Sequence, residues 1–179
     1  LDRLRYRGSA EPILIYSDLL DLVAGRVPLL VEIKSVWAPP DLDFLGQIAD
    51  ASRGYRGPLA LMSFDPAVMA VVRELAPGIA RGIVSGSYQG EGWWSNVLGE
   101  TRRQALSHLL ESGPANPDFY AYHVADLPTP VTRFLREVLG LPLFAWTVRR
   151  PADWTTARRW ADAAIFEGSL PTDALPSAD

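Results

Sequence analysis

Glu32 and Lys34 are the residues whose types and spacing point most clearly to chemistry. They lie two positions apart in the stretch LLVEIKS, and Lys34 is the only lysine among 17 basic residues. An ammonium group beside a carboxylate can form part of a site for a phosphate group or a metal ion. The alternative is a structural ion pair buried in the core, which gains little net stability against the cost of desolvation. We therefore interpret the pair as part of a site.

The alternation of side chains along a strand predicts where this pair points. In a strand from Leu29 to Lys34, Glu32 and Lys34 share one face, and the apolar Leu29, Val31 and Ile33 share the other. We expect the apolar face to meet helices. Glu32 and Lys34 would then point into a barrel near the carboxyl end of the strand, which is where barrel active sites lie.

Strand patterns and helix patterns alternate along the chain. Strands are predicted at Leu29–Lys34, Pro58–Phe64, Arg81–Ser85, Asp118–Tyr122, Pro142–Val148 and Ala163–Glu167. Helices are predicted at Ser17–Ala24, Asp41–Arg53, Pro66–Leu75, Leu98–Ser112, Pro130–Leu139 and Pro151–Ala161. This order indicates parallel strands joined by right-handed helical crossovers.

The choice of α/β fold is between an open doubly wound sheet and a TIM (β/α)8-type barrel. A doubly wound sheet usually carries a glycine-rich phosphate loop, and the sequence contains neither GxGxxG nor GxxxxGK[ST]. We therefore expect about six of the eight β/α units of a barrel. Residues 1–171 would form this partial barrel domain and residues 172–179 a disordered tail. About seventy further residues at the N-terminus would supply the missing units.

Composition excludes several partners. The net charge of -4 and the scattered basic residues argue against nucleic acid binding. The sequence lacks a run of about 18 apolar residues, so we expect no transmembrane segment. It contains no cysteine, which fits a reducing compartment, and we expect a cytoplasmic protein.

Five segments in order resemble the glycerophosphodiester phosphodiesterase family. They are LLVEIKS, LMSFDP at Leu61–Pro66, ELAPGIARGIVS at Glu74–Ser85, FAWTVRRPAD at Phe144–Asp153 and ADAAIFEGSLP at Ala161–Pro171. This resemblance implies a TIM barrel in lipid metabolism that hydrolyses small glycerophosphodiesters to glycerol 3-phosphate and an alcohol. It also implies a divalent metal, Mg²⁺ or Ca²⁺, and two histidines for acid and base catalysis.

By this resemblance, Glu32 is a metal ligand and Lys34 is a catalytic residue that steadies the phosphoryl group. Both roles are physically sound, because hard cations prefer carboxylate oxygens and an ammonium group can stabilise charge on phosphoryl oxygens. Four further residues are expected to bind substrate, namely Trp146, Phe64, His123 and Glu167. For the two aromatic residues the alternative is core packing, and for the two polar residues it is a structural hydrogen bond.

The sequence lacks other family motifs. It has no His-Arg-Gly, no Glu-x-Asp and no His-Asp segment before LLVEIKS, and its two histidines, His108 and His123, lie far downstream. We expect His108 to be structural, in the middle of its helix. The chain would correspond to the C-terminal two-thirds of such an enzyme and would be inactive alone. The alternatives are a lysophospholipase D-like phosphodiesterase and a non-catalytic barrel-like binding module.

The longest irregular stretch is Ser85–Asn96, SGSYQGEGWWSN. In a barrel this loop would rise over the active face, and Tyr88, Trp93 and Trp94 could form a lid. The alternative is that the two tryptophans pack against a neighbouring helix. A partial barrel also leaves strand edges unpaired, so we expect copies of the chain to associate as a homo-oligomer.

Overall fold

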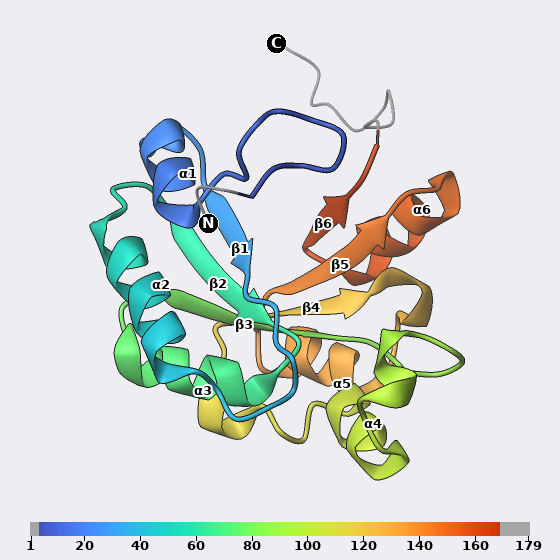
Figure 1. The fold of residues 1–179 in the computed structure, drawn as a ribbon. Coiled ribbons are helices and arrows are strands. Elements are labelled where there is room, and N and C mark those ends of the chain that lie inside the picture. The colour runs from blue at the N-terminus through green and yellow to red at the C-terminus, as the bar shows by residue number, and fades with distance from the viewer. Residues whose placement is uncertain (1–3, 169–179) are drawn as a thin grey trace.

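Six strands form one parallel sheet in the order in which they occur in the sequence. The computed structural model describes residues 4–168 and shows the sheet curling, with helices on its outer side (Figure 1). The strands are β1 Leu29–Glu32, β2 Leu59–Ser63, β3 Ala80–Ser85, β4 Phe119–His123, β5 Leu143–Val148 and β6 Ala163–Phe166. Each strand pairs in parallel with the next, with no reversal of order. This is the arrangement of a partial TIM barrel, as predicted.

The helices occupy the crossovers between strands. They are α1 Tyr16–Val23, α2 Leu42–Gly54, α3 Pro66–Leu75, α4 Glu100–Ser107, α5 Pro130–Arg133 and α6 Pro151–Trp160. Four short turns supplement them, namely η1 Trp93–Asn96, η2 Gly113–Ala115, η3 Val124–Asp126 and the π-helical η4 Phe134–Val138. Within residues 4–168, no helix is both long enough and apolar enough to cross a membrane.

The predicted helix Leu98–Ser112 was wrong at both ends. The helix α4 ends at Ser107, and His108 is its exposed C-cap residue rather than a residue in the middle of a helix. Leu109 then adopts a left-handed backbone conformation with φ of +60°. This turn ends the helix and places the Leu109 side chain in the hydrophobic core. The predicted helix Pro130–Leu139 is also divided, because its second half is π-helical.

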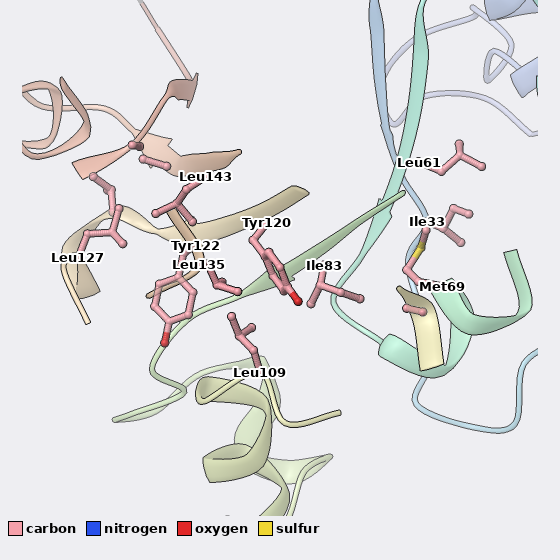
Figure 2. Close-up of a cluster of buried hydrophobic side chains, with 14 of the residues drawn as sticks. Ile33, Leu61, Met69, Ile83, Leu109, Tyr120, Tyr122, Leu127, Leu135 and Leu143 are labelled. Atoms are coloured by element: carbon pink, nitrogen blue, oxygen red, sulfur yellow. The ribbon is translucent and has the colours of Figure 1, made fainter. Parts of the chain in front are cut away.

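The outer face of the sheet is buried against the helices (Figure 2). Ile33, Leu61 and Ile83 project from neighbouring strands into this outer core, where Met69 of α3 is fully buried. Val31 packs against the same cluster, so the apolar alternation of β1 faces the helices as predicted. Each large apolar side chain buried in this way contributes about 1.5–3 kcal/mol to stability.

The inner face of the sheet carries a second, smaller cluster. Its members, which the curled sheet encloses, are Met62, Val84, Phe119 and Ala121, with Ala60, Phe64, Phe144, Trp146 and Ile165 against them. The rings of Phe119 and Phe144 stack at 5.1 Å between centroids. Gly82 pairs with Phe119, and a Cβ atom at position 82 would lie 2.1 Å from that ring. The ring can therefore occupy this space only because residue 82 is glycine.

We expect Gly82→Ala to lower the free energy of unfolding by about 1–3 kcal/mol, because the added methyl group overlaps the Phe119 ring. Urea denaturation measures the change. Gly46→Ala is the matched control, since Gly46 lies inside α2 and an added methyl group would meet no atom within 4 Å. This control should raise stability by about 0.5–1 kcal/mol. Equal stability of Gly82→Ala and the parent protein would contradict the close packing.

The two ends of the sheet, β1 and β6, do not pair with each other, and within residues 4–168 no strand covers their outer edges. Leu30 on β1 and Phe166 on β6 are exposed there. Uncovered parallel edges present backbone N–H and C=O groups that pair readily with another chain. The open ends of the sheet are therefore edges to which another strand can pair.

We expect the isolated 179-residue chain to associate through these edges. Light scattering coupled to size-exclusion chromatography should give a mass of at least two chains, and Leu30→Lys on the β1 edge should reduce it. A monodisperse monomer over a wide concentration range would contradict this expectation.

Candidate active site

The predicted site residues gather at the carboxyl end of the sheet. Glu32 and His123 are the last residues of β1 and β4, Trp146 lies in β5, and Phe64 and Glu167 follow β2 and β6. Parallel strands bring these positions to one side of the molecule, which is the side where TIM-barrel active sites lie.

Five of the six predicted residues line one cavity of about 320 Å³. They are Glu32, Lys34, Phe64, Trp146 and Glu167. The sixth, His123, lines a neighbouring cavity of about 480 Å³. Phe64, Trp93 and Trp146 line both cavities and form the wall between them. The structure thus brings together residues that lie up to 135 positions apart in the sequence, from Glu32 to Glu167.

Glu32 and Lys34 form an ion pair at the mouth of the smaller cavity. Lys34 Nζ donates to Glu32 Oε1 at 2.7 Å, and the side chains of Lys34 and Glu32 are 79% and 24% exposed, respectively. The alternative of a pair buried in the core is therefore wrong, because β1 ends at Glu32 and Lys34 reaches solvent. An exposed pair of this kind contributes little to stability, so the ammonium group can exchange its partner for a ligand.

A chain of buried hydrogen bonds holds the segment that carries this pair. Ser63 Oγ donates to the Ile33 carbonyl at 2.7 Å, and Ser35 Oγ donates to Asp65 Oδ2 at 2.6 Å. Ser35 Oγ also accepts from the Trp37 amide at 2.9 Å. Asp65 is 1% exposed and caps α3, which anchors the chain of bonds in the core. The end of β2 thereby positions the residues that follow β1.

Aromatic side chains cover the smaller cavity. Trp93 stacks on Trp37 at 5.7 Å between centroids, and Phe64 meets the edges of Trp93 and Trp146 at 5.5 and 5.1 Å. The Arg102 guanidinium group lies 5.1 Å from the Trp37 ring. Trp93 thus packs on aromatic residues of the loops and remains 47% exposed, whereas Trp94 packs against a cluster that includes Leu106 of α4, as the alternative predicted. Trp37 was not predicted as a site residue, and its only signal in the sequence was its place just after LLVEIKS.

His123 is held by a carboxylate that was also not predicted from the sequence. Its Nδ1 lies 3.1 Å from Asp126 Oδ2, which accepts a hydrogen bond from the Ser87 amide at 2.8 Å. Gly86 permits this approach, because a Cβ atom there would lie 3.0 Å from His123 Cβ. The signal in the sequence was an acidic residue three positions after a histidine at a strand end.

Two further site residues have defined structural partners. Trp146 Nε1 donates to the carbonyls of Ser85 and Ala121 at 3.0 and 3.2 Å, which fixes the indole ring. Glu167 accepts from Arg149 Nε at 2.8 Å, and both side chains are largely exposed. Glu167 thus has the structural hydrogen bond that we considered as the alternative to substrate binding. A contact between Glu167 and substrate stays a prediction.

A divalent metal would find two carboxylates in this cavity, Glu32 and Glu167, of which Glu167 is paired with Arg149. Within residues 4–168 no group of three or more His, Cys, Asp or Glu side chains is placed to hold a metal ion. Glu32 nevertheless lines the cavity and uses only one oxygen for Lys34. Because Mg²⁺ is commonly bound by one or two carboxylates together with phosphate oxygens and water, Glu32 fits as one ligand of a shared site.

Comparison with known proteins supports the fold. No family model and no curated protein matches the sequence. Among solved structures, a candidate glycerophosphoryl diester phosphodiesterase from Silicibacter pomeroyi DSS-3 is similar with TM-score 0.61 and 24% identity, over 84% of this chain and 52% of its own. An Oleispira antarctica phosphodiesterase in complex with the product sn-glycerol-3-phosphate is similar with TM-score 0.55 and 15% identity, over 84% of this chain and 56% of its own.

A glycerophosphodiester phosphodiesterase from Parabacteroides distasonis is also similar, with TM-score 0.52 and 16% identity, over 84% of this chain and 58% of its own. The chain therefore spans between half and three-fifths of the length of these three proteins. The predicted resemblance to glycerophosphodiester phosphodiesterases is confirmed for the fold, which is a partial TIM barrel.

We expect Ser35→Ala to lower the free energy of unfolding by about 1–3 kcal/mol, because it leaves the buried Asp65 carboxylate short of a donor. The same change should alter Trp37 fluorescence, since the Trp37 amide loses its acceptor. Ser17→Ala on the exposed face of α1 is the control and should stay within about 0.5 kcal/mol. If both variants unfold at the same urea concentration as the parent protein, the hydrogen-bond chain does not hold the site.

Proposed function

We propose that the chain supplies part of the active site of a metal-dependent glycerophosphodiester phosphodiesterase. The enzyme would hydrolyse glycerophosphodiesters to glycerol 3-phosphate and an alcohol. The observation that carries this proposal is the placement of Glu32 and Lys34 at the carboxyl end of β1, in one cavity with Phe64 and Trp146. The fold shared with the Oleispira antarctica phosphodiesterase, which binds sn-glycerol-3-phosphate as its product, supports the same conclusion.

Lys34 would bind the phosphoryl group. Its ammonium group is largely exposed and forms a surface ion pair with Glu32, so an anionic phosphodiester can take the place of Glu32. The positive charge would then stabilise the charge that develops on the phosphoryl oxygens in the transition state. The same exchange would release the Glu32 carboxylate from its ion pair.

Glu32 would be one ligand of a divalent cation, Mg²⁺ or Ca²⁺. When bound, such an ion supplies a Lewis acid that polarises the phosphoryl group. Phe64 and Trp146 would exclude water from one side of the substrate, and Glu167 would contact the polar glycerol end. The sequence lacks the family's N-terminal histidine motifs, so this chain would act together with residues that those motifs contribute in the longer proteins.

The larger cavity favours hydrolysis of small diesters over the alternative of a lysophospholipid substrate. An acyl chain needs a continuous apolar channel, whereas this cavity places Asp126 and His123 beside its aromatic rings. A small polar alcohol can use those groups for hydrogen bonds. The proposal and the non-catalytic alternative differ in what they expect of Glu32. Only the proposal expects hydrolysis that is lost when Glu32 is replaced.

We expect Glu32→Gln, made in the complete protein, to lower kcat for metal-dependent release of glycerol 3-phosphate by about 10²–10³-fold. Lys34→Met should have a similar effect, because it removes the charge that faces the phosphoryl group. An enzymatic assay for glycerol 3-phosphate at saturating Mg²⁺ or Ca²⁺ measures both.

The control is Glu137→Gln, which removes an exposed carboxylate paired with Arg133 on the far side of the helical layer and should leave kcat unchanged. Unchanged activity of Glu32→Gln would refute the metal-ligand role. Absence of any hydrolysis by the complete parent protein would favour the binding module.

A further inference from the structure

The cavity of about 480 Å³ has a composition that the proposed phosphodiesterase chemistry does not require. Five aromatic side chains line it, namely Phe64, Tyr88, Trp93, Trp94 and Trp146. The rings meet at steep angles, with Tyr88 edge-on to Trp94 at 5.8 Å and Trp93 edge-on to Trp94 at 5.8 Å. Aromatic side chains arranged around a cavity in this way can present ring faces and edges to a ligand from several sides.

Apart from the ionisable His123, the only charged side chain that lines this cavity among the described residues is an acidic one. The described lining residues include no lysine and no arginine, and their one carboxylate is Asp126. Two hydrogen bonds fix Asp126, from the Ser87 amide and with His123, and its side chain is 22% exposed. Burial raises the pKa of Tyr88 to about 12, so its hydroxyl group is neutral at physiological pH. The Ser87 amide and the His123 ring together hold Asp126 at the aromatic wall.

A ligand cation of low hydration suits this combination best. Aromatic faces attract cations, and recognition of quaternary ammonium groups by several rings is a recurring use of this force. A small, strongly hydrated cation would lose its water shell against the aromatic wall without gaining enough oxygen ligands in return. An anionic group would be repelled by Asp126. A quaternary ammonium group is attracted by both the rings and the carboxylate.

The neighbouring cavity places the opposite charge where an anionic phosphate would bind. Lys34 lies on the other side of this wall, with Nζ 5.9 Å from the Phe64 ring, and the centroids of the Trp146 and His123 rings are 5.1 Å apart. A zwitterionic phosphodiester extended across the wall would thus meet a cation at its phosphate and aromatic rings with a carboxylate at its alcohol.

We propose that the cavity lined by Trp94 and Asp126 is a subsite for a quaternary ammonium group on the alcohol moiety of the phosphodiester. The assignment of the occupant as the alcohol moiety of a substrate rests on the proposed function. Binding of the cation itself follows from the cavity alone. Trp94 and Asp126 line only this cavity and not the smaller one, which makes them specific positions for a test.

The direct test is calorimetric titration of the complete protein with choline and with its neutral isostere, in which a tert-butyl group replaces the trimethylammonium group. Choline should bind at least about fivefold more tightly than the isostere, because only choline gains the cation–π attraction. Trp94→Leu and Asp126→Asn should each weaken choline binding by at least about fivefold. Asp43→Asn, which removes an exposed carboxylate in α2, is the control and should bind choline like the parent protein.

Equal affinity for choline and the isostere, or no binding of choline by the folded protein, would overturn the subsite. Unchanged choline binding in Asp126→Asn would overturn it as well, even if Trp94→Leu fails to fold. The proposed function is tested separately, by an assay for hydrolysis of glycerophosphocholine and of glycerophosphoglycerol. If neither is hydrolysed while choline binding depends on Asp126, the phosphodiesterase proposal fails and the cation subsite stands. If both are hydrolysed equally and choline does not bind, the subsite fails and the phosphodiesterase proposal stands.

Discussion

Burial of the outer face of the sheet against the helices sets the direction of the side chains that the strands contribute to the candidate site. Ile33, Leu61 and Ile83 must leave water, and they do so by facing α3 and its neighbours. Because successive side chains of a strand alternate, the residues between them must face the interior of the curl. Phe64, Trp146 and Glu32 occupy those inner positions at the carboxyl ends of their strands, so the cavity forms as a consequence of the outer core.

The outer core does not by itself hold the segment after β1, which lies beyond the last ladder hydrogen bonds of a short strand. The buried Asp65 and the hydroxyl groups of Ser35 and Ser63 supply that support. A carboxylate with 1% exposure requires donors, and Asp65 finds one in the Ser35 hydroxyl group of the loop that carries Lys34 and another in the Ala67 amide of α3. The buried Asp65 carboxylate is thus linked to the loop beside the candidate site through the Ser35 hydroxyl group.

The strands and the orientation of Glu32 could be predicted because they follow from local alternation, and each strand boundary agrees to within two residues. The end of α4 at Ser107 could not, because the left-handed turn at Leu109 is stabilised by contacts with distant parts of the core. The places of Trp37 and Asp126 in the site were also hidden from the sequence. Both depend on the approach of two loops that are separate in the chain.

The proposed function depends most on one event, in which Lys34 exchanges its Glu32 partner for a phosphoryl group at the carboxyl end of β1. A crystal structure of the complete protein with sn-glycerol 3-phosphate and Mg²⁺ tests it most directly. We predict a phosphate oxygen within hydrogen-bond distance of Lys34 Nζ and a metal ion on the Glu32 carboxylate. Phosphate bound elsewhere, with the Lys34–Glu32 pair intact, would contradict this prediction.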